Sequence, residues 1–387
     1  MRNKNIIVLA VLFFMSCGGK DRTVDSVPSN PDATPSAVAV LEYIARLSSD
    51  DMGRVISGQN CLHGNQICDG KGNGYSTMIG ELHAQSGKFT GIIGLDYEHD
   101  KIFTSAELSE ANAVLIDYWN NGGLVAINWS PQSPWLNDES DIDSDPGVWS
   151  NTRVNDSYSE NLNKVDIPKL LDPHEAVYAV WHKKLDRIAG ALMQLRDAGV
   201  VVLWRPMQEM NGFWFWWGTA SDPGNMDNYK SLYIDMFNYF TKEKKLNNLL
   251  WVYSPTSSNP LIGVVEVMEQ YPGDAYVDIV GGTQYSDSLE IRDYEVYRNC
   301  GKAIAMSEYG ISDSGSYSSD GSFDNRTYIS VLSKKYADIA YWVTWHDWDT
   351  GGGVMNHMSL KSNLNSTALM NDVNVITRAE VGSSLRR

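Results

Sequence analysis

Short apolar runs recur along the chain at intervals that are typical of strands separated by helices. Eight runs carry this pattern, and they cover residues 54–57, 89–95, 123–129, 200–204, 249–253, 277–283, 303–306 and 340–345. Several of them, including the run at 200–204, are apolar without alternation, which is the pattern of parallel strands covered on both faces. The sequence therefore predicts eight mostly buried parallel strands.

Helical periodicity fills several of the intervals between these runs. One apolar stripe extends over residues 177–195, with Asp-Pro at 172–173 as cap and first turn and Gly199 as the stop. A second stripe covers residues 232–240. Eight strands with helices between them predict a (β/α)8 TIM barrel in the α/β class. A doubly wound open sheet is the alternative, but neither a GxGxxG motif nor a phosphate-binding loop follows any run.

The N-terminal part differs in composition from the rest of the chain. Arg2 and Lys4 precede an apolar run at 6–15, which is too short to span a bilayer and is typical of an export signal. Cys17, in the stretch FMSCGG, stands where a bacterial lipoprotein signal carries its lipidated cysteine. The residues after it are rich in Pro, Ser and Asp and lack periodicity, which predicts a disordered tether. We expect an export signal at 1–16, a lipidated tether at 17–37 and the barrel at 38–380.

This N-terminus predicts the location of the protein. We expect an exported, outer-membrane lipoprotein of a Gram-negative bacterium, facing the periplasm or the cell surface and touching the membrane only through a lipid on Cys17. In an exported protein, Cys61 and Cys68 are candidates for a disulfide that closes a short loop, which leaves Cys300 as a buried thiol.

Charge and histidine spacing narrow the class of ligand. The formal net charge of −17 repels polyanions, so nucleic acid and acidic polysaccharides are excluded and a neutral ligand is favoured. The seven histidines show neither HExxH nor a pair spaced for zinc. The acidic stretch at 138–147 departs from a calcium loop at Pro146 and Thr152. We expect no metal and no other cofactor, and a monomer.

Two glutamates follow strands of the predicted barrel. Reactive groups of such barrels lie where strands end at the carboxyl face, and Glu209 follows the fourth run while Glu308 follows the seventh. Three strand–helix units of a barrel of ~250 residues take ~94 residues, close to the 99 (308 − 209) observed here. We therefore expect the two carboxyls to face each other. One such group can protonate a departing glycosidic oxygen while the other meets the oxocarbenium-like carbon.

Five consecutive aromatic residues, 213–217, follow Glu209. Neither a helix nor a half-buried strand has this period, so some of the rings must face something other than the core. A sugar ring that covers ~100 Å² of an indole contributes up to about 2.5 kcal/mol at ~25 cal/mol/Å². We expect Trp214 to bind a sugar, Trp217 to be a further candidate, and the other three rings to pack under the loop.

Three stretches resemble glycoside hydrolase family 26. They are WRPMQEMNG with the aromatic run at 204–217, YPGDAYVD at 271–278, and SEYG at 307–310. That family consists mainly of β-mannanases that retain the anomeric configuration on a (β/α)8 barrel. The resemblance implies that Glu209 is the acid/base and Glu308 the nucleophile.

The resemblance also suggests the binding residues. Tyr285 matches a tyrosine that holds the nucleophile, Trp214 a substrate-binding tryptophan, and Trp345 a tryptophan under the sugar at the cleavage point. We add Arg205, because we expect Arg205 and Tyr285 together to keep Glu308 ionised. The full set of candidate substrate-binding residues is Arg205, Gln208, Trp214, Trp217, Tyr285, Trp345 and Trp129.

Two positions depart from the family pattern. Gln208 stands where His usually precedes the acid/base, and Ser130 follows Trp129 where the family usually has His. Gln offers a donor and an acceptor but carries no charge, so it can still recognise hydroxyls with a different geometry. We expect a retaining, endo-type β-1,4-mannanase acting on mannan, galactomannan, glucomannan or manno-oligosaccharides, with an exo mode possible. A mixed-linkage β-glucanase and a non-catalytic glycan-binding lipoprotein are the alternatives.

Overall fold

The structure is a computed structural model that describes residues 22–49, 53–154, 159–221, 225–312, 319–351 and 353–385. The α-helices of these residues are α1 (Pro35–Leu47), α2 (Glu81–Ser86), α3 (Ser105–Asn120), α4 (Ser159–Leu162), α5 (Ala176–Asp197), α6 (Asp227–Asn238), α7 (Tyr294–Arg298), α8 (Arg326–Lys335), α9 (Ser366–Met370) and α10 (Arg378–Leu385). The strands are β1 (Val55–Ile56), β2 (Gly58–His63), β3 (Ile92–Asp96), β4 (Leu124–Trp129), β5 (Val202–Pro206), β6 (Leu249–Tyr253), β7 (Ile279–Tyr285), β8 (Ala303–Gly310), β9 (Ile339–Thr344), β10 (Trp348–Asp349), β11 (Met355–Asn356) and β12 (Val375–Ile376). The expected export signal at 1–16 and Cys17 lie outside the described residues.

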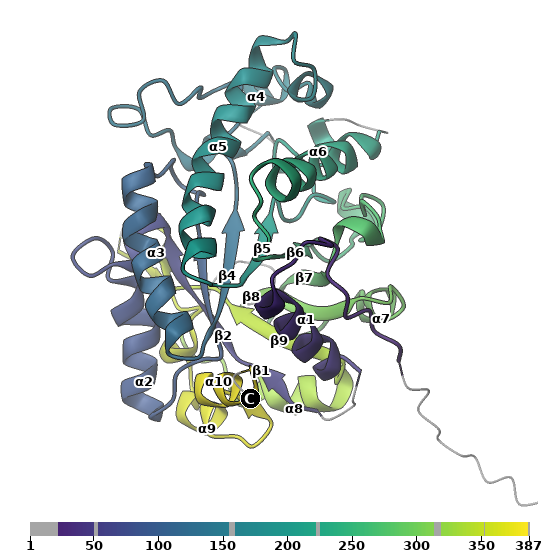
Figure 1. The fold of residues 1–387 in the computed structure, drawn as a ribbon. Helices are drawn as coiled ribbons and strands as arrows, with labels where there is room; N and C mark the ends of the chain where they lie inside the picture. The colour runs from purple at the N-terminus through teal and green to yellow at the C-terminus, as the bar shows by residue number, and fades with distance from the viewer. Residues whose placement is uncertain are drawn as a thin grey trace, which may run out of the picture.

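Strands β2 to β9 form a closed parallel barrel. Each strand from β2 to β8 pairs with the next one in the sequence, and β9 pairs with both β8 and β2. Helices such as α3, α5 and α6 lie outside the strands (Figure 1). The predicted (β/α)8 barrel is confirmed, and the doubly wound open sheet is excluded because the sheet closes on itself.

The first barrel strand is β2, which begins after the run predicted at 54–57. That run forms β1, which pairs with β12 and touches β9 through one residue pair. A Cβ on Gly58 would lie 2.3 Å from the carbonyl oxygen of Trp342, so only glycine permits this approach of β9. Strand β2 was not predicted because its composition is too polar to form an apolar run. As a result, the carboxyl end of this strand is His63, several residues later than expected.

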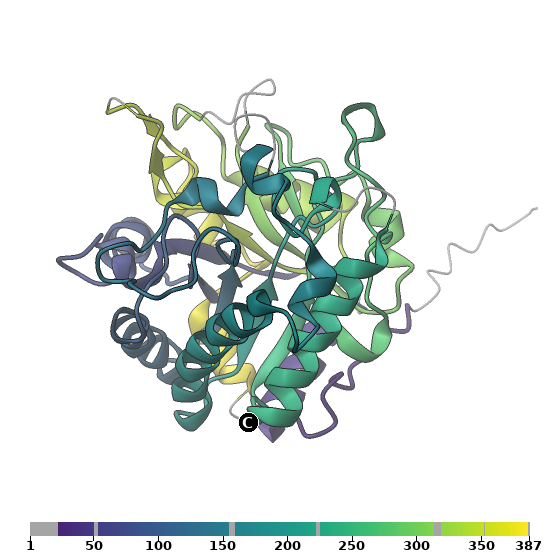
Figure 2. The same cartoon turned by 90° about the horizontal axis from the view of Figure 1, so that it is seen from above.

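Helix α1 closes the amino end of the barrel. The Thr34 hydroxyl caps the helix by accepting a hydrogen bond from the backbone of Ala37, and Pro35 occupies the first turn. The buried face of the helix packs on the amino ends of the strands. Purple α1 and the C-terminus lie at the bottom of Figure 2, and the yellow hairpin β10–β11 lies at the top. The carboxyl end of the barrel is therefore free to carry a site.

Residues 22–34 run along the barrel instead of forming a free tether. Asp25 forms an ion pair with Lys302 at 2.7 Å, and the backbone nitrogen of Ser29 donates to the Asp278 carboxylate at 2.6 Å. The predicted disorder is therefore wrong for this segment. Its polar side chains and backbone groups bond to the barrel, a role that composition alone does not reveal.

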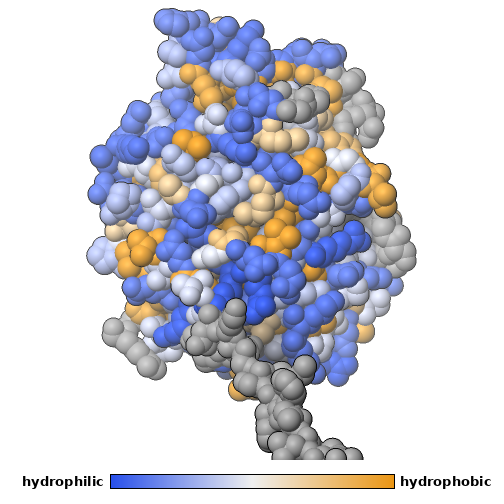
Figure 3. Space-filling model, turned by 90° about the vertical axis from the view of Figure 1, so that its right-hand side faces the viewer, coloured by the Kyte–Doolittle hydropathy of each residue, from blue (hydrophilic) through white to orange (hydrophobic). Residues whose placement is uncertain are grey.

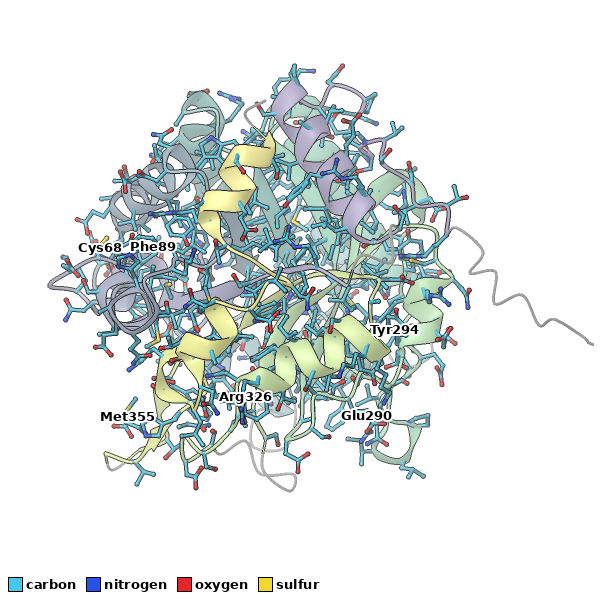
Figure 4. The ribbon with its side chains drawn as sticks, turned by 90° about the horizontal axis from the view of Figure 1, so that it is seen from below. Cys68, Phe89, Glu290, Tyr294, Arg326 and Met355 are labelled. Carbon is cyan, nitrogen blue, oxygen red and sulfur yellow. The ribbon has the colours of Figure 1, made fainter. Side chains whose placement is uncertain are left out.

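The cysteines also differ from expectation. Cys61 and Cys68 are free thiols, so the predicted disulfide between them is wrong. Cys61 is fully buried in β2, where its sulfur lies 3.7 Å from the carbonyl oxygen of Gln59, and burial raises the pKa of its thiol. Cys68 is partly exposed and lies at the periphery of the molecule, seen from below in Figure 4. Cys300 is a third free thiol, partly buried.

One face of the surface is largely polar. The face on the right of Figure 1 is mostly hydrophilic, with hydrophobic residues in separate areas (Figure 3). Within the described ranges, no helix combines the length and the apolar composition that a bilayer crossing requires.

Candidate active site

Glu308 lies near the carboxyl end of β8 and is held by two donors. Arg205 Nη1 lies 2.8 Å from its Oε2, and the Tyr285 hydroxyl donates to its Oε1 at 2.7 Å. Burial raises the pKa of Glu308 above its usual value, and the Arg205 guanidinium and the Tyr285 hydroxyl offset part of this increase. Both contacts favour the carboxylate form. We therefore assign the negative charge of this site to Glu308.

The guanidinium of Arg205, on β5, is fixed by residues in or directly after the next two strands, β6 and β7. Its Nε donates to Ser254 Oγ at 2.7 Å, and its Nη2 donates to Thr283 Oγ1 at 2.6 Å. These bonds leave Nη1 directed at Glu308. The sequence analysis missed Ser254 and Thr283, although Ser254 directly follows the predicted run at 249–253 and could have been found by the strand-end rule.

Glu209 lies in the loop after β5 with an unusual backbone. Its φ is +58° and that of Met207 is +47°, a region that costs energy for residues with a side chain. The loop is fixed because the Glu209 backbone nitrogen donates to the Ser254 carbonyl at 2.7 Å. The indole nitrogen of Trp214 donates to Glu209 Oε2 at 2.9 Å.

The two glutamates differ in protonation. Burial, followed by the negative charge of Glu308, raises the pKa of Glu209 to about 7. Glu308 instead has a cation and a hydroxyl at its two oxygens. The pair therefore holds one neutral and one charged carboxyl near neutral pH, as acid and nucleophile chemistry requires.

The aromatic run at 213–217 divides into a surface part and a buried part. Trp214 is partly exposed, whereas Phe215 and Trp217 are buried and stack at 4.4 Å between ring centroids. The indole nitrogen of Trp217 donates to the backbone oxygen of Gln208 at 2.8 Å. The prediction that Trp217 contacts the sugar is therefore wrong, because its side chain has no exposed surface. Its role is to support the loop that carries the acid/base candidate.

Trp129 is a second correction. It ends β4 with no exposed surface, stacks on Trp181 of α5 at 5.5 Å, and donates to Glu98 Oε2 at 3.1 Å. Side chains alternate along a strand, and here it is Asn128 that bonds to Asp96 of the neighbouring strand. The prediction of a sugar contact by Trp129 is wrong because its indole packs outward against the helix layer.

Gln208 and Ser130, the two departures from the family pattern, contact each other. Gln208 Nε2 donates to Ser130 Oγ at 2.7 Å, and both side chains are buried. Trp345 follows β9 and keeps 8% of its surface exposed. Substrate contacts of Gln208, Trp214 and Trp345 stay predictions.

Three histidines that were not among the candidate site residues lie around Trp345. The ring centroids of His63, His99 and His346 lie 6.1, 6.3 and 4.7 Å from that of Trp345. His346 was visible as a strand-end residue. His63 was missed because β2 was not recognised, and His99 because it lies beyond the end of β3.

These features define a class of protein. A (β/α)8 barrel with two buried glutamates of different surroundings, one after β5 and one on β8, beside a partly exposed tryptophan, is the arrangement of a glycoside hydrolase. The family model of glycosyl hydrolase family 26 matches residues 29–380. The chain belongs to this family.

Relatives support this assignment. The chain is 32% identical over 362 residues to mannan endo-1,4-beta-mannosidase A and B of Caldalkalibacillus mannanilyticus, a match that covers 91% of this chain and 63% of that protein. It is 28% identical over 406 aligned positions to mannan endo-1,4-beta-mannosidase of Bacillus subtilis, covering 100% and 99% of the two chains. The solved structure of Bacillus subtilis mannanase man26 superposes with a TM-score of 0.73 at 26% identity, covering 91% and 95%.

Proposed function

We propose that this protein is an endo-1,4-β-mannosidase that cleaves internal β-1,4-mannosidic bonds by a retaining double displacement. The observation that carries the proposal is the pairing of Glu209, with a pKa of about 7, with a Glu308 carboxylate bound by Arg205 and Tyr285. The names of the relatives supply the substrate class.

In the first step, a Glu308 oxygen attacks the anomeric carbon as the bond to the leaving oxygen breaks. The proton of Glu209 moves to the leaving oxygen, so a neutral alcohol departs and a glycosyl ester forms on Glu308. The ester has no charge. Because the Glu308 charge is one of the causes that raise the pKa of Glu209, that pKa falls once the ester has formed.

In the second step, the same change in pKa lets Glu209 act as a base. It takes a proton from a water molecule whose oxygen attacks the anomeric carbon, and the Glu308 carboxylate leaves. Both side chains then return to their starting protonation. Arg205 and Tyr285 stabilise the carboxylate at the start and end of the cycle.

The substrate that fits this site is a neutral β-mannan, including galactomannan and glucomannan. The net charge of −17 does not repel such a polymer. Trp214 and Trp345 supply the aromatic surfaces, and the indole nitrogen of Trp214 is already bonded to Glu209. Gln208 and Ser130 provide hydroxyl-recognising groups next to the acid/base.

The test compares linear mannan, galactomannan, glucomannan and lichenan as substrates of the purified protein. Hydrolysis of the mannans supports the proposal, and it should disappear in Glu308→Ala while polysaccharide binding remains. Cleavage of lichenan alone would establish the glucanase alternative instead. Binding without any hydrolysis by the wild-type protein would establish a non-catalytic glycan-binding protein.

Two further measurements address the mode of cleavage. Proton NMR of the first product shows whether the β-anomer is formed, as retention requires. Mannohexaose should give products of several lengths from the start, whereas mannobiose alone would indicate an exo mode.

We also propose that the protein is exported, carries a lipid on Cys17 and acts as a monomer in the outer membrane. Support comes from the signal-like sequence before Cys17. Metabolic labelling with a fatty acid should mark the wild-type chain and leave Cys17→Ala unlabelled. The molar mass of the purified protein, measured by light scattering, tests whether it is a monomer.

A further inference from the structure

His63, His99 and Asp100 form a group of potential metal ligands beside the carboxyl end of the barrel. Each offers one ligand atom, and these atoms lie within 4.8 Å of one another. The residues come from the end of β2 and from the segment after β3, which pair as neighbouring strands. No sequence motif reveals this group, because His63 is far from His99 and Asp100 in the chain and approaches them only in the fold.

The two imidazoles are arranged to act together. Their rings are stacked with centroids 4.6 Å apart and an angle of 7° between the planes, and each ring has a nitrogen within 4.8 Å of the other ligand atoms of the group. His63 Nδ1 lies 3.0 Å from Asp96 Oδ2. A carboxylate at one ring nitrogen fixes the proton there and leaves Nε2 with its lone pair, as is usual for metal-binding histidines.

Three buried polar atoms of this group, His63 Nδ1, His99 Nδ1 and Asp100 Oδ1, lack a hydrogen bond to any described residue. Of these, His63 Nδ1 has the Asp96 carboxylate close by. The neighbouring Gln66 reaches only the other oxygen of Asp100, at 3.4 Å. A buried polar atom without a partner is unfavourable, and a bound ligand would remove this cost.

The backbone that carries these ligands is held on both sides. Gly64, directly after His63, has a φ of +45°, and a Cβ there would lie 2.2 Å from a ring carbon of Phe103. Glu98, directly before His99, is an ion-pair partner of the buried Arg187 and also accepts the Trp129 indole. The group is therefore positioned by the core and not by mobile surface contacts.

We propose that His63, His99 and Asp100 bind one divalent transition-metal ion of the Zn²⁺ type, with water completing its coordination. Two imidazole nitrogens and one carboxylate oxygen suit zinc, whereas calcium and magnesium prefer oxygen ligands alone. Ligand atoms around tetrahedral zinc are about 3.4 Å apart, so the distances in this group, at most 4.8 Å, must shorten by up to about 1.4 Å on binding. The Asp96 carboxylate behind His63 adds negative charge to the site.

The group contains neither Glu209 nor Glu308, and it lies next to Trp345, which both imidazole rings approach. The metal is a structural or regulatory ligand of this wall of the barrel and takes no part in the proton transfers proposed for Glu209. Metal binding is measurable without any substrate, so its failure and a failure of the proposed function are distinguishable.

The experiment titrates Zn²⁺ into chelator-treated, full-length protein by calorimetry, with Co²⁺ absorption as a spectroscopic check. We expect one ion per chain. His99→Ala and Asp100→Asn should each weaken binding at least tenfold, because each removes one of three protein ligands. The matched control is His174→Ala, which removes an exposed histidine outside the group and should leave the affinity unchanged.

The unfolding midpoint of each metal-free variant is measured first. If His99→Ala does not fold, Asp100→Asn decides alone, since it is nearly isosteric. Absence of Zn²⁺ binding to the wild-type protein, or wild-type affinity in any folded ligand variant, would overturn the proposal.

Discussion

Replacing Tyr285 by Phe removes one hydroxyl from Glu308 and leaves the aromatic ring in place. The hydrogen bond is 2.7 Å long, and its acceptor is a carboxyl residue with 5% of its surface exposed. A hydrogen bond to a charged group contributes about 1.5–3 kcal/mol. Since Arg205 still holds the other oxygen, Glu308 stays in position. We expect kcat/KM to fall about 10- to 150-fold, with about 1.4 kcal/mol for each factor of ten.

The same substitution should change the pH profile in one direction. The Tyr285 hydroxyl lowers the pKa of Glu308, so its loss raises that pKa. Glu308 must be ionised to attack, and the acid limb of kcat/KM therefore moves to higher pH. The alkaline limb moves less, because burial and the Glu308 charge are the main causes of the pKa of about 7 at Glu209.

The assay measures kcat/KM on a manno-oligosaccharide from about pH 4 to about pH 9. The matched control is Tyr309→Phe, which removes a hydroxyl that donates at 2.6 Å to the backbone oxygen of Ser286 and not to a carboxylate. It should keep the wild-type profile. Wild-type kcat/KM and an unmoved acid limb in Tyr285→Phe would refute this account of the nucleophile.

Three other outcomes follow from the structure. The wild-type kcat/KM on mannan should decline as the pH rises through about 7, where Glu209 loses its proton, and Glu209→Gln should lose polysaccharide turnover at every pH. Arg187→Met leaves the buried Glu98 carboxylate without its cation, while Glu139 keeps Lys184, and should cost about 3–5 kcal/mol in a denaturant titration; Arg196→Met, at an exposed pair, should cost less than about 1 kcal/mol. Cys68→Ser should leave the unfolding midpoint unchanged with or without reductant, and a reductant-dependent drop in the wild-type protein would show that a disulfide forms after all.

The sequence indicated the candidate catalytic pair because a parallel barrel brings all its strand ends to one face. Runs of buried residues are easy to recognise, and the first polar residues after them fall at that face. Glu209, Glu308 and Arg205 were found in this way, and the site contacts of Tyr285 agree with the family resemblance.

The features that the sequence did not predict depend on contacts between segments that are distant in the chain. Local sequence patterns do not report such contacts. Trp129 looked like a sugar platform, but the direction of a side chain at a strand end depends on how the strand alternates inside the barrel. Strand β2 is held by its neighbours and a glycine and not by apolar residues. The ligand group of His63 and His99 exists only because β2 and β3 are adjacent.

The docked segment at 22–34 determines how the enzyme would stand on a membrane. Arg22 donates to backbone oxygens of Ser48, after α1, and of Arg298 and Lys302, before β8, all at the amino end of the barrel. With the lipid that we propose on Cys17, five further residues reach Arg22, a span of at most about 18 Å. The barrel would then sit close to the bilayer on its closed end, with its catalytic opening turned outward to meet long polymer chains.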